Sequence, residues 1–181
     1  MTWQLLQDYK GKFELIEPVV KKAWCDSVLD IGCNAGAITN LFGDAGYFAV
    51  GIDRNVNCNG KHEKACVGQF KLDLDGIDKL PKFDAILLLS VLHQIIKEDG
   101  EEYAQFFVWA LLRRCNVLII ELAAINSKYG YYQKFIDNNQ PSIFRFLQEF
   151  VKESATVEFI GEAKHNGTNE PKRFIFKLVP R

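Results

Sequence analysis

The chain has 181 residues, of which 48% are hydrophobic and 25% are charged, so its length and composition fit one globular domain with a sizeable core. With 22 basic and 23 acidic residues, its net charge of −1 provides no overall field that would draw it to nucleic acid or to an anionic membrane. The 5 cysteines show no C-x-x-C spacing, which predicts free thiols in a reducing compartment and no disulfide or metal site.

The first part of the chain is expected to be helical. Residues 3–24 carry apolar side chains at approximate three-or-four spacing, which predicts one or two helices with Pro18 as a break. The N-terminus is polar from its start, and no apolar run in the chain approaches the roughly 18 residues of a membrane span. We therefore expect a cytoplasmic protein. The apolar side chains of the helix predicted over residues 3–24 are Leu5, Leu6, Tyr9, Phe13, Ile16 and Val20.

A buried strand over residues 27–31 runs into a glycine turn and then a helix. Its branched apolar side chains are typical of an inner parallel strand covered on both faces. Gly32 and Gly36 bracket the turn, where glycine permits unusual backbone angles and lets a ligand approach the main chain. We expect the helix to begin near Asn34 or Ala35, with its unpaired N–H groups directed into the same space.

Two carboxylates make this turn a candidate ligand site. Asp30 lies at the carboxyl end of the first strand. The next strand is predicted over residues 47–52, and Asp53 follows at its carboxyl end. Asp53 follows Gly32 at about the 20-residue spacing at which an acid hydrogen-bonds ribose hydroxyls in nucleotide-binding α/β folds. The turn reads G-x-x-x-G and lacks the middle glycine of the G-x-G-x-x-G turn that binds a pyrophosphate, which disfavours a nicotinamide-dependent reductase. An acid beside the turn suits a cationic group instead.

Three further strands are predicted along the middle of the chain, over residues 68–74, 83–90 and 116–122. Asp73 in the first of them either contacts a ligand or caps the following turn. The second ends in a turn that holds His93, a candidate base or a histidine satisfied by backbone hydrogen bonds. The third presents Glu121 at its carboxyl edge. The helix between the last two strands has the core stripe Tyr103, Phe106, Phe107, Ala110 and Leu111.

The last third is expected to hold a helix after Pro141 and two strands over residues 156–162 and 173–178. Before that helix, the segment 127–132 carries three tyrosines and a lysine, which either clamp a sugar or a base or pack against the core. His62, in an irregular connection after Arg54, is expected to be a solvated side chain.

The stretch from Asp30 to Gly36, followed by Gly51-Ile52-Asp53, resembles the first two motifs of class I S-adenosylmethionine-dependent methyltransferases. The resemblance implies an α/β fold, a doubly wound Rossmann-like seven-stranded and mostly parallel sheet with a C-terminal antiparallel hairpin. It also implies a single methyltransferase domain over residues 1–181, in which residues 1–25 form a helical cap over the mouth of the site. Tyr9 and Phe13 would then contact substrate or pack in the core.

The same resemblance implies S-adenosylmethionine as cofactor, with S-adenosylhomocysteine as product. Asp30 would hold the methionine amino group, Asp53 the ribose and Asp73 the adenine amino group. The chain lacks the N-P-P-Y or D-P-P-Y signature of enzymes that methylate base amino groups, which disfavours that acceptor. The full set of predicted cofactor residues is Asp30, Gly32, Cys33, Asn34, Gly36, Asp53, Arg54, Asp73, Leu74, Leu89 and Ser90.

The second half carries a narrower resemblance on residues 90–94, 120–123, 160–162 and 173–176. These residues resemble the methyltransferase part of bacterial enzymes that cap O-antigen polysaccharide chains and, more faintly, RNA 5′-phosphate methyltransferases. These resemblances imply methyl transfer to an oxygen, in a sugar hydroxyl or a phosphate of a glycan or small molecule, or to a 5′ phosphate or ribose of RNA. His93 and Glu121 are then the candidate bases and Arg173 the candidate anion partner. A module that binds the cofactor without catalysis is the alternative from another class.

Overall fold

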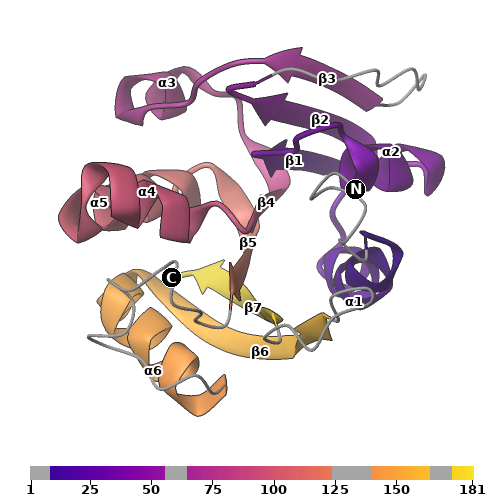
Figure 1. Cartoon of the computed structure of the whole chain (residues 1–181). Helices are drawn as coiled ribbons and strands as arrows, with labels where there is room; N and C mark the ends of the chain where they lie inside the picture. The colour runs from indigo at the N-terminus through magenta and orange to yellow at the C-terminus, as the bar shows by residue number, and fades with distance from the viewer. Residues whose placement is uncertain (1–8, 56–64, 124–139, 164–172) are drawn as a thin grey trace, which may run out of the picture.

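The computed structural model of the chain describes residues 9–55, 65–123, 140–163 and 173–181 (Figure 1). Its helices are α1 (Tyr9–Lys22), α2 (Ala37–Asp44), α3 (Leu74–Lys79), α4 (Leu92–Asp99), α5 (Glu101–Leu112), α6 (Gln140–Val151) and the short 3-10 helix η4 (Lys152–Ser154). Its strands are β1 (Ser27–Ile31), β2 (Phe48–Asp53), β3 (Ala65–Gln69), β4 (Phe83–Leu89), β5 (Cys115–Ala123), β6 (Ala155–Ala163) and β7 (Arg173–Pro180).

The strands form one seven-stranded sheet in the order β3-β2-β1-β4-β5-β7-β6. Strands β1 to β5 pair in parallel, whereas β7 runs antiparallel to both β5 and β6. The predicted mostly parallel sheet with a C-terminal antiparallel hairpin is therefore confirmed. Because the chain crosses from β3 to β4 on the other side of β1, the strand order reverses between β1 and β4, and ligands bind such sheets at the carboxyl ends beside that reversal.

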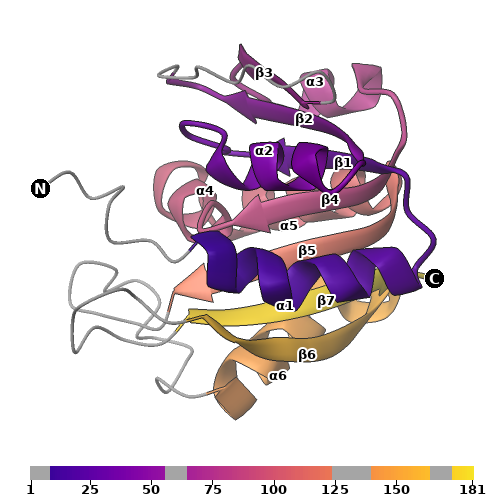
Figure 2. The same cartoon turned by 90° about the vertical axis from the view of Figure 1, so that its right-hand side faces the viewer.

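Helices cover both faces of the sheet. Figures 1 and 2 show α1 and α2 on one face and α3, α4, α5 and α6 on the other. Two apolar cores result, one built around Leu29, Ile86 and Leu118 and the other around Val28, Leu87 and Ile119. Consecutive residues of one strand thus serve opposite cores, which is why the inner strands are apolar without interruption. No helix in the described ranges is both long enough and apolar enough to cross a membrane.

The structure corrects several predicted boundaries. Helix α1 continues through Pro18, because Ile16 and Val20 on either side of it are fully buried and their packing outweighs the lost backbone hydrogen bond. Helix α2 begins at Ala37 and not near Asn34. Strand β3 ends at Gln69, so residues 70–73 form a connection and not the end of a strand. The predicted core residue Phe106 is 47% exposed.

Candidate functional site

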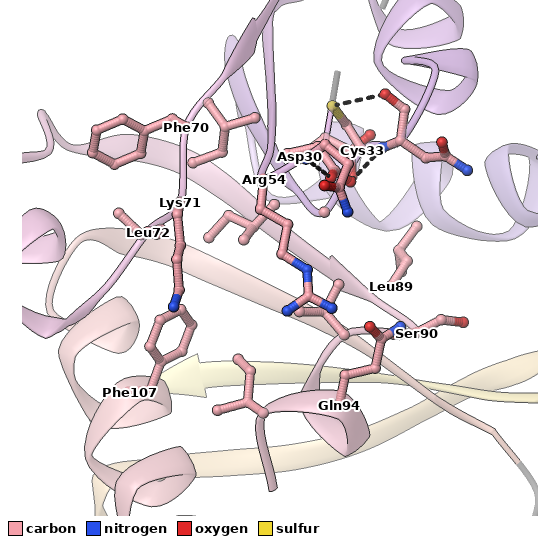
Figure 3. Close-up of a pocket in the computed structure, with 18 of the residues that line it drawn as sticks. Asp30, Cys33, Arg54, Phe70, Lys71, Leu72, Leu89, Ser90, Gln94 and Phe107 are labelled. Carbon is pink, nitrogen blue, oxygen red and sulfur yellow. Dashed lines mark hydrogen bonds between the residues drawn. The ribbon is translucent and has the colours of Figure 1, made fainter. Parts of the chain in front are cut away.

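A cavity of about 540 Å³ lies at the carboxyl edge of the parallel strands, a size in the range of small-molecule sites. The ends of β1, β2 and β4, the connection after β3, and helices α1, α4 and α5 contribute its walls. Figure 3 shows Arg54 reaching from the side of Asp30 and Cys33 toward Gln94 and Ser90. The predicted cofactor residues that line the cavity are Asp30, Gly32, Cys33, Asn34, Asp53, Arg54, Asp73, Leu89 and Ser90.

The glycine turn is held by β2. The Gly32 and Cys33 N–H groups donate to the Ile52 carbonyl at 2.7 and 3.2 Å, and the Asn34 N–H donates to Asp53 Oδ2 at 2.9 Å. These three N–H groups are therefore bonded within the protein. The expectation of unpaired N–H groups at the start of the helix is wrong for Asn34. The turn instead presents Gly32, at φ 75°, as a surface without a side chain.

Gly36 has a packing role. It adopts φ 75° at the N-terminus of α2, and an added Cβ there would lie 2.7 Å from Val67 Cγ2 on β3. Gly36 is not among the described residues that line the cavity. Glycine at this position thus lets the turn lie against β3, while Gly32 is the glycine of the turn that borders the cavity.

Asp30 is a buried carboxyl group at the cavity wall. It is 3% exposed, and its Oδ2 accepts a hydrogen bond from Thr39 Oγ1 at 2.8 Å. Burial raises the pKa of Asp30 to about 6, although the Thr39 hydrogen bond and the charge of Lys12 act in the opposite direction. At neutral pH Asp30 is therefore a buried carboxylate at an energetic cost, which a cationic ligand would offset.

This cost predicts that Asp30→Asn stabilises the protein without ligand above pH 6. The folded state holds the Asp30 proton up to about pH 6, whereas an unfolded aspartate releases it near 3.9, so the destabilisation is complete at pH 7.5 and disappears near pH 4. We expect the variant to raise the free energy of unfolding at pH 7.5 by about 1–3 kcal/mol. Urea unfolding at both pH values measures this, and an equal gain at pH 4 would contradict the assigned cause.

Asp53 joins the ends of two segments at the cavity. Its Oδ2 accepts from the Asn34 N–H, and its Oδ1 accepts from the Asn55 N–H at 2.8 Å. A carboxylate offers about four acceptor positions, so both oxygens keep capacity for ligand hydroxyls. Beside it, Arg54 pairs with Glu98 of α4 through two contacts of 2.6 and 2.9 Å that join opposite walls of the cavity.

Apolar side chains line the end of the cavity that lies away from Asp30 and Cys33 (Figure 3). Phe70, Leu72 and Phe107 line it together with Asp73. The Asp73 side chain accepts a hydrogen bond from the Gly76 N–H at 2.8 Å, so the structure confirms capping, one of the two roles considered for Asp73. Leu72 lines the cavity, whereas Leu74, which belongs to the predicted set of cofactor residues, is not among its described lining residues. The reason is that β3 ends at Gln69, so the connection over residues 70–73 lines the cavity and Leu74 already begins α3.

A buried ionic cluster lies beside the cavity at the ends of β4, β5 and β7. Glu121 is 0% exposed, and its two oxygens contact Lys12 Nζ at 2.6 Å and Arg173 Nη1 at 3.0 Å. The Ser90 hydroxyl donates to Glu121 and accepts from Arg173. Burial would raise the pKa of Glu121, but the charges of Lys12 and Arg173 outweigh it and hold the pKa below its ordinary value. Ser90 itself has a φ of 61°. Residues with such strained backbone conformations cluster at functional sites.

His93 lies in the first turn of α4, not in a loop, and is 3% exposed. Burial and then the Arg173 charge lower the pKa of His93 to about 4, so the imidazole is neutral at pH 7. His93, Glu121 and Arg173 are not among the described residues that line the cavity, whereas Lys12 and Ser90 are. The structure thus places the three predicted catalytic residues together, one layer behind the cavity wall.

Lys12 is the most informative residue that sequence reasoning missed. It is 1% exposed and lies one turn before Ile16 and two turns before Val20 on the inward stripe of α1. A lysine in register with a buried stripe was the available signal. Of the two aromatic residues expected on the same helix, Tyr9 lines the cavity, while Phe13 packs against Phe42 with ring centroids 5.0 Å apart. The expectations for His62 and for the tyrosines of residues 127–132 fall outside the described residues.

Solved structures provide the comparison for this geometry. A crystal structure of WbdD matches with a TM-score of 0.76 and 21% identity, covering 96% of this chain and 40% of that one. Another is described as the bifunctional kinase-methyltransferase WbdD, at a TM-score of 0.72 and 19% identity with the same coverage. Magnesium protoporphyrin IX methyltransferase from Synechocystis PCC 6803 with bound SAH matches at 0.59 and 16%, covering 94% of this chain and 84% of that one. The chain has a Rossmann-like methyltransferase fold.

These similarities define the fold and not the substrate, since identity stays at 21% or below. The chain spans about two fifths of the length of the WbdD chains. No protein-family model matches the sequence, and no curated protein sequence matches it. The residues at the cavity must therefore carry the functional argument.

Proposed function

We propose that the chain is an S-adenosylmethionine-dependent methyltransferase whose cofactor binds in the cavity at the carboxyl edge of the sheet. One observation carries the proposal. Three carboxylates line a single cavity around the Gly32 turn: Asp30 and Asp53 at the ends of β1 and β2, and Asp73 at the N-terminus of α3. Their order matches a ligand with a cationic end, a sugar and a base.

The residues fit this cofactor chemically. Asp30 suits the methionine ammonium, because a buried carboxylate gains most from a paired cation. Asp53 has acceptor capacity for the ribose hydroxyls. Leu72 and Phe107 provide apolar surface for the adenine, beside Asp73. The fold shared with the solved methyltransferases, one of which carries SAH, supports the same assignment.

When bound, S-adenosylmethionine supplies a methyl group on a sulfonium, which an acceptor oxygen displaces in line to leave S-adenosylhomocysteine. The enzyme contributes mainly by placing the acceptor. A hydroxyl acceptor also needs a base, and both predicted bases are weak here: the pKa of Glu121 is lowered and that of His93 is about 4. An acceptor oxygen that is already ionised needs none. We therefore favour a phosphate over a sugar hydroxyl, on a glycan or small molecule.

Calorimetry tests cofactor binding. We expect S-adenosylhomocysteine to bind and NADH not to bind. Asp53→Ala should weaken the binding of S-adenosylhomocysteine by about 1–3 kcal/mol, because it removes charge-assisted hydrogen bonds. The matched control is Asp75→Ala, a first-turn residue of α3 that is not among the described lining residues. Unchanged affinity in folded Asp53→Ala, or equal losses in both variants, would remove Asp53 from the ribose site.

A matched pair of acceptors tests the chemistry. Labelled S-adenosylmethionine is incubated with a sugar phosphate and with the same sugar unphosphorylated, and in parallel with an RNA carrying a 5′-phosphate or a 5′-hydroxyl. We expect label on phosphorylated acceptors as methyl esters. Transfer chiefly to the unphosphorylated compounds would overturn the phosphate assignment. Cofactor binding without transfer to any of a broad acceptor set would favour the non-catalytic binding module.

A further inference from the structure

An ion pair between Arg54 and Glu98 crosses the mouth of the cavity. Arg54 directly follows β2, and Glu98 lies in the last turn of α4. Both nitrogens of the guanidinium fork donate to the carboxylate, at 2.6 and 2.9 Å. The two side chains line the cavity and are 45% and 46% exposed, whereas Asp30 and Ser90 in the same lining are 3% and 5% exposed. The pair therefore lies at the solvent side of the cavity.

The pair bounds the cavity without filling it. The volume is about 540 Å³ with the two contacts in place, which is within the range of sites that enclose small molecules. In Figure 3 the Arg54 side chain lies between the apolar residues Leu72 and Phe107 and the end of β4 with Leu89 and Ser90. A ligand that extends from the apolar end toward β4 would thus pass beneath Arg54.

The backbone on both sides of the pair is fixed. The Phe70 N–H donates to the Asp53 carbonyl at 2.8 Å, and Gln69 Nε2 donates to the Arg54 carbonyl at 3.1 Å, while Glu98 belongs to a helix. Opening the mouth therefore requires rotation of the two side chains only. Exposed side chains rotate within picoseconds to nanoseconds, and exposed ion pairs are weak. Such a pair opens often, so it acts through the fraction of time that it is open.

We propose that the Arg54–Glu98 ion pair is a gate across the mouth of the cofactor cavity, which opens for passage of the ligand and closes again over the bound ligand. The inference rests on the proposed cofactor. It assigns to Glu98 control of the rates of binding and release. Because the pair forms in the free and in the loaded protein, both rates depend on the open fraction and the affinity does not.

A cycle of variants isolates the gate. Surface plasmon resonance on the full chain measures the association and dissociation rates of S-adenosylhomocysteine for the wild type, Glu98→Gln, Arg54→Met and Arg54→Met/Glu98→Gln. The matched control is Glu101→Gln, the same change three residues further along, in the first turn of α5. Glu101 is exposed and is not among the described residues that line the cavity.

Glu98→Gln is expected to raise both rates by the same factor, about two- to fivefold, which corresponds to the loss of an exposed ion pair, and to leave the affinity unchanged. Glu101→Gln should keep the wild-type rates. In the Arg54→Met background, Glu98→Gln should alter neither rate, because the pair is already absent.

Three results would overturn the gate: wild-type rates in Glu98→Gln, a change in only one of the two rates, or the same effect of Glu98→Gln with and without Arg54. A change in only one rate would make Glu98 a residue that alters affinity. If the wild type does not bind S-adenosylhomocysteine, the proposed cofactor is wrong and the inference fails with it. That result is distinct from binding with unchanged rates, which removes the gate and leaves the cofactor in place.

Discussion

Gly32→Ala is expected to reduce the affinity for S-adenosylhomocysteine at least 100-fold. Gly32 lies at φ 75°, a conformation that disfavours a side chain, and the added Cβ would overlap Cγ2 of Val91 in the cavity wall. The turn must then shift, and the turn also positions Asp53 through the Asn34 N–H. Calorimetry measures the affinity, and thermal unfolding establishes that the variant is folded.

Gly68→Ala is the matched control for this substitution. Gly68 lies in β3 without a positive φ, and an added Cβ there meets nothing within 4 Å. We expect it to leave the affinity within about twofold. Val91→Ala combined with Gly32→Ala removes the overlap but not the strain, so it should restore part of the binding. Wild-type affinity in folded Gly32→Ala would mean that the cofactor does not bind at this turn.

Glu121→Gln is expected to lower the free energy of unfolding by about 3–5 kcal/mol. The substitution keeps the shape of the side chain but removes the negative charge that contacts the buried Lys12 and Arg173. Chemical denaturation at pH 7 measures the loss. Lys12→Met/Glu121→Gln should be less destabilised than Glu121→Gln alone, because it removes one of the two buried cations that contact Glu121 in the wild type.

The pH dependence gives a second measure of the same cluster. The folded-state pKa of Glu121 is lowered, so its contribution to stability is present above the unfolded value of about 4.3 and is lost as the pH falls through the folded value. The destabilisation of Glu121→Gln should therefore shrink in acid. An equal loss at pH 7 and at pH 3 would show that the missing charge is not its cause.

The ends of the inner strands could be located from the sequence because each strand is a local run of apolar residues. Asp30 and Asp53 follow uninterrupted apolar runs, and the parallel topology brings such ends to one edge, so their shared cavity could be predicted without coordinates. Gly32 likewise marks a turn that the structure places at the cavity wall. In each case the signal lies within a few residues of the group concerned.

Contacts between distant segments could not be predicted in the same way. Lys12 of α1 contacts Glu121 of β5, and Arg173, the first residue of β7, donates to Ser90 after β4. The cluster therefore forms only when four separate parts of the chain pack together. From the sequence alone, Glu121 is a candidate base. In the structure, the charges of Lys12 and Arg173 lower its pKa and make it a weak base. The shift from Leu74 to Leu72 had a simpler cause, the early end of β3, which no local turn signal marks.

A crystal structure of the chain with S-adenosylhomocysteine tests the central claim most directly. We expect the adenine between Leu72 and Phe107, the ribose hydroxyls on Asp53 and the methionine ammonium on Asp30, beside the Gly32 turn. Density for the ligand elsewhere on the protein, or in this cavity with the ribose away from Asp53 and the ammonium away from Asp30, would contradict it.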